Sequence, residues 1–395
     1  MTAININRRR FMQIGSLGVG AKLMEPTGAE AKPTPNSSQS EVNVDQNVVR
    51  MTGDGLGLTP IDTASLWTRL ASEKGIERDN YSIGGTVAEL ESYFAKILGK
   101  ERAVFFPTGT LANHLAVRAL SNGAGRTIVQ AESHLFNDSG DCVQNLSGIT
   151  LMPLAPGRAT FRLDEVRDVI QRTASGRVAR PVSVISLETP VRRRFGEMFD
   201  ETEMQRITAF AKHEGINLHL DGARLFLQSA YTGKDVADYT RPFDTVYISL
   251  YKYFNAPSGA ILAGTHSLLK NMYHARRMFG SGLPSAWPFA AIAHHYAPNF
   301  VKRFQRAATV SKSFFNSIDN HESFSVDPFV NGTNLFRLRV SNADLASFRK
   351  RLSARGVILG PLRSSDRSFL LSVNETWNHM SSTELHDIFI DSLNT

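Results

Sequence analysis

Two apolar segments of the sequence each end beside a charged residue. Residues 216–220 have the composition of a buried strand, stop at Asp221, and are followed by a helical pattern. Residues 245–250 are again rich in β-branched and apolar side chains, and Lys252 follows them. Adjacent strand ends of an α/β sheet open into the crevice where ligands bind. The sequence therefore predicts a carboxylate and an amine at the same edge of one sheet.

An amine and a carboxylate in such a crevice suit pyridoxal 5′-phosphate (PLP). A lysine binds the aldehyde of this cofactor as a Schiff base, and an aspartate keeps the pyridine nitrogen protonated. Each residue also has an ordinary interpretation, because Asp221 could cap the following helix and Lys252 could simply be solvated. Their occurrence together, with an anion-binding turn elsewhere in the chain, favours the cofactor site.

The anion-binding turn follows a short strand pattern at 103–106. Residues 107–110 read Pro-Thr-Gly-Thr and open a helix. A helix N-terminus offers free N–H groups at the positive end of the helix dipole and binds phosphate readily. Gly109 allows the backbone to approach an anion, and the hydroxyl of Thr110 can donate a hydrogen bond. The alternative is a helix capped by Thr108 with nothing bound.

His134 follows a strand pattern that ends near residue 130. A histidine at this place could stack on a flat cofactor ring. It could also be an ordinary core or surface imidazole, which is the usual role of a lone histidine.

From residue 86 onward the chain alternates between helical and strand patterns. The strand patterns stand at 103–106, 127–130, 182–187, 216–220, 245–250 and 260–263, and helical patterns lie at 87–98, 110–120 and 201–213. Alternation of this kind predicts an α/β fold with a mostly parallel sheet covered on both faces.

Beyond about residue 290 the pattern changes. The segments are a long helix at 291–315, strands at 334–340 and 369–373, and helices at 345–354 and 382–393. We therefore expect a large domain over residues 53–290 and a small C-terminal α+β domain over residues 291–395.

The N-terminus predicts export. Residues 7–12, Asn-Arg-Arg-Arg-Phe-Met, resemble a twin-arginine signal and precede a mildly apolar stretch, and residues 29–31 offer small side chains to a signal peptidase. We expect a signal peptide over residues 1–31 and a flexible linker over residues 32–52. The alternative is a disordered basic tail on a cytoplasmic protein.

The composition and the spacing of residues argue against several classes of protein. The formal net charge is +7, but the basic residues are dispersed, with one compact run in the body of the chain at 192–194. Nucleic-acid binding is therefore disfavoured, and anionic small ligands explain positive charge equally well. No segment is long and apolar enough to span a membrane, no zinc-finger spacing is present, and the single cysteine, Cys142, excludes an intrachain disulfide.

Five motifs carry a resemblance to a known family. They are residues 79–91, the turn at 106–113, Glu132-Ser133-His134, His219 to Leu225, and Lys252 with Ala256-Pro257-Ser258-Gly259. From about residue 53 to the C-terminus the chain resembles the threonine aldolase and aromatic β-eliminating lyase family of fold-type-I PLP enzymes.

The resemblance implies a fold-type-I, transferase-like α/β fold and a PLP-dependent lyase that acts on an amino acid. Aldol-type Cα–Cβ cleavage of a β-hydroxy-amino acid is the expected reaction. β-Elimination or racemisation of another amino acid is one alternative, and a non-catalytic binding protein of the PLP fold is another. The family also implies a homodimer or homotetramer and no metal.

Residue roles follow from the same resemblance. Lys252 would hold PLP and afterwards relay protons, Asp221 would pair with the pyridinium nitrogen, and His134 would stack on the ring. Gly109 and Thr110 would bind the phosphate.

The resemblance also implies how the substrate is held. Arg224 would contact the ring oxygen or the substrate carboxylate. Arg367 would clamp that carboxylate through two hydrogen bonds, with Arg363 as its rival for this role.

One departure from the family bears on the reaction. The family's aldolases have a histidine that reaches the β-hydroxyl of the substrate, and Val191 stands at its place here. Valine cannot move a proton, and retro-aldol cleavage needs a base. Another residue must supply that base for aldol cleavage to occur. Tyr251 and Tyr253 also flank Lys252 where the family has small residues, which suits a larger or more aromatic substrate.

Overall fold

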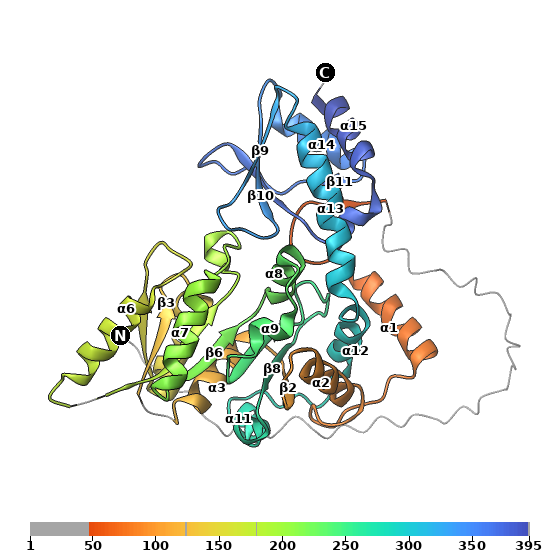
Figure 1. Ribbon diagram of the computed structural model, residues 1–395. Coiled ribbons are helices and arrows are strands. Elements are labelled where there is room, and N and C mark those ends of the chain that lie inside the picture. The colour runs from red at the N-terminus through yellow and green to blue at the C-terminus, as the bar shows by residue number, and fades with distance from the viewer. Residues whose placement is uncertain (1–46, 123–124, 179, 394–395) are drawn as a thin grey trace, which may run out of the picture. The chain divides into compact units, whose positions relative to one another are not determined.

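A seven-stranded sheet lies at the centre of the protein (Figure 1). The computed structural model describes residues 47–122, 125–178 and 180–393. Its strands, in spatial order, are β2 (Arg102–Phe106), β8 (Ala260–Gly264), β7 (Thr245–Ser249), β6 (Asn217–Asp221), β5 (Val182–Glu188), β3 (Arg126–Gln130) and β4 (Thr150–Leu154). Strand β8 runs antiparallel to both of its neighbours, and the pairs from β7 to β4 are parallel. The predicted α/β fold with a mostly parallel sheet is confirmed.

Both faces of the sheet are covered, which explains why its strands are apolar without alternation. Phe106 packs with α3 on one face, whereas its neighbour Phe105 belongs to the core on the other face. The helices of this part are α1 (Pro60–Lys74), α2 (Gly85–Ile97), α3 (Gly109–Leu120), α4 (His134–Asn137), α5 (Cys142–Ser147), α6 (Leu163–Ala174), α7 (Glu201–His213), α8 (Leu225–Thr232), α9 (Val236–Thr240), α10 (His266–Leu269), α11 (Met272–Met278) and α12 (Trp287–Tyr296), with a 3-10 turn, η2 (Arg192–Arg194).

The C-terminal part holds a second, antiparallel sheet. Its order is β12 (Ser368–Ser372), β10 (Leu335–Val340) and β9 (Phe324–Pro328). The remaining elements are α13 (Phe300–Ile318), α14 (Leu345–Ala354), α15 (Ser382–Leu393) and the 3-10 helix η3 (Glu375–His379). Helix α13 packs against α8, η3 and α15.

The predicted linker is wrong at its C-terminal end. Strand β1 (Val49–Arg50) pairs in parallel with β11 (Val357–Ile358), and the side chains of Val49 and Met51 are fully buried. These residues are therefore part of the C-terminal core, far from them in sequence. The predicted signal peptide and the first residues of the linker lie outside the described residues.

The single long helix expected at 291–315 is also wrong. Two helices, α12 and α13, are separated at residues 297–299, where Pro298 lacks a backbone N–H and Asn299 has a left-handed φ of 57°. Helix α12 packs against α1 and α2 of the large-sheet part. A division after residue 290 would therefore cut through α12.

Among residues 47–122, 125–178 and 180–393, no helix combines the length and the apolar character that a membrane span needs.

Candidate active site

Asp221 ends β6 and is held by a buried hydrogen-bond chain. The side-chain amide of Asn113 donates to Oδ2 of Asp221 at 2.7 Å, so the Asn113 oxygen faces His219 Nε2 at 2.9 Å. His219 Nε2 is therefore the donor, and the hydroxyl of Thr245 donates to Nδ1 at 2.8 Å. Burial lowers the pKa of His219 to about 4, which keeps its ring neutral. Asn113 and His219 thus fix the orientation of the Asp221 carboxylate.

Lys252 follows β7, beside the strand that Asp221 ends. Burial and the nearby charge of Arg224 lower the pKa of Lys252 to about 8, and the charge of Asp221 opposes this shift. Lys252 and Asp221 line the same cavity of about 190 Å³, hereafter the inner cavity. An amine with a lowered pKa is more often unprotonated, which suits a nucleophile.

The first turn of α3 forms another wall of the inner cavity. Thr108 caps the helix by accepting a hydrogen bond from the Leu111 N–H, and Thr108, Gly109 and Thr110 all line the cavity. A Cβ at Gly109 would lie 2.1 Å from the hydroxyl oxygen of Tyr247, so any side chain here would collide. The free N–H groups of this turn and the hydroxyls beside it form a donor set that suits a phosphate.

Glu188 ends β5 and stands opposite Asp221 in the register of β5 and β6. Its buried carboxylate accepts hydrogen bonds from the backbone N–H groups of His134, at 2.6 Å, and Arg192, at 2.9 Å. Burial, reinforced by the charge of Asp221, raises the pKa of Glu188 to about 7. Glu188 therefore joins two loops at the mouth of the site to the end of the sheet.

Arg224 is held by an acidic residue of the glycine-rich loop at 53–57. Its Nε and Nη2 atoms lie 2.9 and 2.8 Å from Oδ2 of Asp54, and Oδ1 of Asp54 accepts a weaker hydrogen bond from Asn334 at 3.3 Å. Burial disfavours the Asp54 anion, but the charge and hydrogen bond of Arg224 hold the pKa of Asp54 below its usual range. The pair places the Arg224 guanidinium in the cavity wall.

A wider cavity of about 960 Å³, hereafter the outer cavity, adjoins the inner one. His134, Arg192, Arg224, Tyr251 and Lys252 line both cavities and so form their boundary. The wall beyond this boundary includes residues of α1 and of the loop before it, among them Leu58, Pro60 and Trp67.

The structure brings together all but one of the predicted site residues. Gly109, Thr110, His134, Asp221, Arg224 and Lys252 all line the inner cavity. Arg367 does not, because it is exposed in a turn with a left-handed φ of 50° and lines neither cavity. Its rival Arg363 lies over the ring of Phe195 and also lines neither cavity. The assignment of Arg367 as the carboxylate clamp is therefore corrected.

Val191 is fully buried and lines neither cavity, whereas the next residue, Arg192, lines both. The sequence interpretation missed Arg192, Asp54, Glu188 and Asn113. Glu188 had a usable signal, because it ends a strand of the same sheet as Asp221. Arg192 was visible only as part of a basic run, and Asp54 only as part of a glycine-rich loop.

A lysine and an aspartate at the carboxyl edge of this sheet, beside an anion-binding helix terminus, define the class of fold-type-I PLP enzymes. The family model described as β-eliminating lyase matches residues 62–340. The chain belongs to this family. Its cofactor is PLP, whose aldehyde, pyridine nitrogen and phosphate fit Lys252, Asp221 and the α3 terminus, and it is a PLP-dependent lyase.

Individual proteins also resemble this chain. A low-specificity L-threonine aldolase of Candida albicans is 27% identical over 268 residues, which cover 66% of this chain and 71% of the relative. The alanine racemase TOXG of Cochliobolus carbonum is 30% identical over 210 residues, or 53% of this chain and 53% of the racemase. A solved Listeria monocytogenes structure assigned as an L-allo-threonine aldolase has a TM-score of 0.72 and 26% identity, covering 89% of this chain and 97% of that one.

Proposed function

We propose that the protein cleaves a β-hydroxy-amino acid between Cα and Cβ, giving glycine and an aldehyde. The observation that carries the proposal is the inner cavity, where Lys252, Asp221 and the first turn of α3 meet beside His134. PLP supplies, when bound, an electron-poor ring that accepts the electron pair released at Cα.

The inner-cavity residues divide the work of holding the cofactor. Lys252 would bind the aldehyde carbon and afterwards carry protons to and from Cα. Asp221, held by its buried hydrogen bonds, would keep the pyridine nitrogen protonated. Gly109 and Thr110 would bind the phosphate at the α3 terminus.

His134 is the base that we assign to the β-hydroxyl of the substrate. Val191 is buried and cannot act, and His134 lines both cavities. Its Nδ1 atom lies 3.7 Å from Oδ2 of Asp138, so the carboxylate stabilises the ring once it has taken up a proton. The same imidazole would stack on the cofactor ring.

Arg224 binds the α-carboxylate of the substrate. It lines both cavities, and Asp54 fixes its guanidinium through Nε and Nη2. A planar guanidinium held in this way suits a carboxylate. The assignment replaces Arg367, which is exposed outside both cavities.

Racemisation is a second candidate, because one relative with 30% identity is named an alanine racemase. Deprotonation of Cα by Lys252 would begin that reaction as well. Detection of D-alanine from L-alanine separates it from cleavage.

The test is an absorbance scan of the purified protein followed by a panel of β-hydroxy-amino acids, assayed for glycine and aldehyde. The wild-type protein is expected to absorb in the visible range and to release both products. Lys252→Ala is expected to lose the lysine-linked absorbance band and more than about a thousandfold in turnover. Absence of products with every member of the panel, or unchanged turnover in Lys252→Ala, would refute the proposal.

We also propose that the protein forms a homodimer or homotetramer in which the active sites lie near a subunit boundary. A single species of 43.6 kDa in solution would contradict this assembly. The two-domain division remains part of the proposal, with its boundary moved from 290 to residues 297–299, between α12 and α13. Limited proteolysis should cut there before it cuts within either helix.

Export through the twin-arginine pathway is proposed for residues 1–31. The sequence motif at residues 7–12 supports it. A fusion of residues 1–31 to a reporter should be exported, and Arg8→Lys with Arg9→Lys should retain the reporter inside the cell.

A further inference from the structure

Arg192 occupies the place in the cavity that Val191 leaves unused. The Val191 side chain is fully buried, and the backbone N–H of Arg192 is fixed by the carboxylate of Glu188. The Arg192 side chain lies at the boundary of the inner and outer cavities, together with His134 and Lys252. A group attached to Cβ of the substrate would lie in this region, because His134 acts on the β-hydroxyl.

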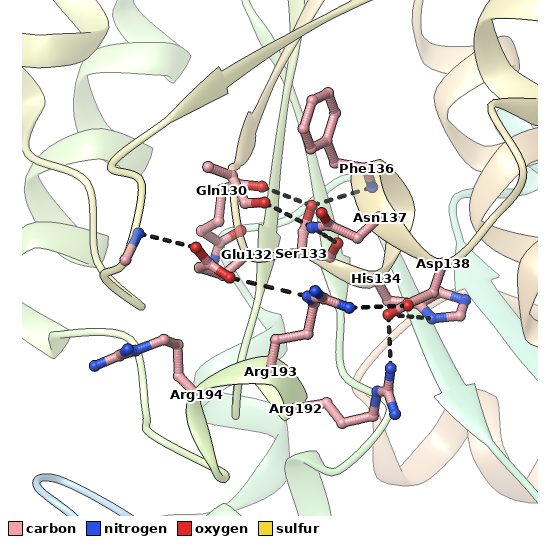
Figure 2. A network of polar contacts seen from close by, with 12 residues as sticks. Gln130, Glu132, Ser133, His134, Phe136, Asn137, Asp138, Arg192, Arg193 and Arg194 are labelled. Carbon is pink, nitrogen blue, oxygen red and sulfur yellow. Dashed lines mark hydrogen bonds and ion pairs between the residues drawn. The ribbon is translucent and has the colours of Figure 1, made fainter. Parts of the chain in front are cut away.

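Asp138 holds the guanidinium of Arg192 from one side. Figure 2 shows the Asp138 carboxylate between the side chains of His134, Arg192 and Arg193. Oδ2 lies 2.8 Å from Nη2 of Arg192, and Oδ1 lies 3.2 Å from Nη1 of Arg193. One carboxylate thus serves two guanidinium groups.

The remaining guanidinium donors of Arg192 meet no acceptor in the part of the chain that the structure describes. Within the described segments, Nη2 is the one guanidinium atom of Arg192 in a hydrogen bond, so Nε and Nη1 are available. Adjacent guanidinium N–H groups match the two oxygens of a carboxylate. The side chain is half exposed, with 50% of its surface accessible, so it can meet a ligand from the outer cavity.

The boundary between the cavities therefore carries two arginines. An amino acid with a neutral side chain offers one carboxylate, which Arg224 takes. Arg192 is then left without a substrate partner. A second carboxylate on the β-substituent would satisfy it.

We propose that Arg192 selects β-hydroxy-amino acids with an acidic side chain, of which β-hydroxyaspartate is the smallest. This inference rests on the proposed function. In the reaction the Cα–Cβ bond breaks, the β-hydroxyl loses its proton to His134, and Cβ becomes the aldehyde carbon of glyoxylate. Cα gains a proton, and glycine is the second product. Atoms balance without an oxidant or reductant.

The experiment compares the wild-type holoenzyme with Arg192→Gln, Arg192→Lys and the control Arg194→Gln. Arg194 belongs to the same short helix, pairs with Glu197 and lines neither cavity. Binding of L-aspartate and L-alanine, which lack a β-hydroxyl, is read from the change in cofactor absorbance. Cleavage of β-hydroxyaspartate and of threonine is measured in parallel, and PLP affinity is measured for each variant.

Wild type is expected to bind L-aspartate at least about tenfold more tightly than L-alanine, as a charge-assisted carboxylate contact predicts. Arg192→Gln should lose this preference and raise KM for β-hydroxyaspartate about tenfold, with threonine cleavage changed less than about twofold. Arg192→Lys should recover part of the preference, and Arg194→Gln should match wild type.

Two results would overturn the inference. One is equal binding of aspartate and alanine by the wild type. The other is an Arg192→Gln protein with weaker PLP binding and an unchanged aspartate preference, which would make Arg192 a phosphate ligand. Failure of the proposed function is distinct, since it would abolish cleavage of both substrates while the binding preference could still be read.

Discussion

The inner and outer cavities differ in how their polar side chains are held. At the inner cavity, Asn113, His219 and Asp221 are each at most 3% exposed and are joined by direct hydrogen bonds. In the wall of the outer cavity, hereafter the mouth, the side chains of Arg192 and Asp138 are 50% and 23% exposed and form an ion pair. Buried networks are rigid and costly to break, whereas exposed ion pairs contribute little to stability.

This difference separates the residues that hold the cofactor from the residues that determine which substrate is bound. The inner residues come from β6, α3 and the end of β7, which the packing of the sheet holds in place. The mouth residues come from short turns, α4 and η2. We therefore expect inner substitutions to cost both folding and function, and mouth substitutions to change activity or selectivity alone.

The largest expected effect is at Gly109. In Gly109→Ala the new Cβ would lie 2.1 Å from the Tyr247 hydroxyl, so the start of α3 must shift away from its place in the cavity wall. We expect the free energy of unfolding to fall by about 3 kcal/mol and PLP affinity to fall more than about tenfold. Both are measured, by denaturant titration and by absorbance on adding PLP.

Gly176→Ala is the matched control, because its Cβ would meet nothing closer than 3.5 Å. Wild-type PLP affinity in Gly109→Ala would show that the α3 terminus does not hold the phosphate.

A smaller effect is expected at Asn113. Asn113→Ala removes the donor to Asp221 and the acceptor of His219, leaving two buried polar atoms without partners. The expected cost is about 2 kcal/mol of unfolding free energy, measured by urea denaturation. Asn320→Ala, which removes one exposed hydrogen bond to the Asn316 carbonyl, should cost far less. Equal losses in the two variants would mean that the inner network is no more rigid than the surface.

The sequence could indicate that Asp221 and Lys252 lie close together for a physical reason. Asp221 and Lys252 follow neighbouring strands, and parallel strands bring their carboxyl ends to one edge. Helices with long apolar stripes were equally predictable from the sequence, since the predicted bounds of α7, α14 and α15 are those of the structure.

The sequence also contains local signals for other helices. Helix α1 opens with a capping box between Thr59 and Asp62, and α6 has apolar residues on one face at Leu163, Val166 and Val169. Strand β1 had no local signal, because two residues become a strand only by pairing with Val357 and its neighbour.

The mouth was harder to predict than the sheet edge. Asp54 meets Arg224 across 170 positions of sequence, and Asp138 meets Arg192 across 54. No periodic pattern links such loops, and their distances depend on tertiary packing. The exposure of Arg367 depends on a left-handed turn that the sequence does not announce.

A third prediction concerns the charge of Lys252 in the apoprotein. Burial lowers the pKa of Lys252 from its usual 10.5 to about 8 in the folded protein, so the unfolded chain binds more protons between these values. The free energy of unfolding should therefore rise with pH in this window, by roughly 1 kcal/mol for each pH unit. Lys252→Met apoprotein lacks this rise, so the difference between the two proteins isolates it. If the free energies of unfolding of the wild-type and Lys252→Met apoproteins changed in parallel from pH 8 to pH 10, Lys252 would not be desolvated.

The smallest effect on stability is expected at Asp138. Asp138→Asn removes ion pairs to Arg192 and Arg193 whose side chains are 50% and 41% exposed. We expect the free energy of unfolding to change by less than about 1 kcal/mol. Turnover should nevertheless fall about tenfold, because the His134 ring loses the carboxylate that stabilises its protonated form.

The control is Asp164→Asn, which removes a carboxylate 4.0 Å from Arg167 on the exposed face of α6 and should change neither quantity. Denaturation and steady-state kinetics on the same preparations separate the two effects. A stability loss in Asp138→Asn as large as that of Asn113→Ala would mean that the mouth belongs to the rigid core. Unchanged turnover would show that Asp138 does not assist His134.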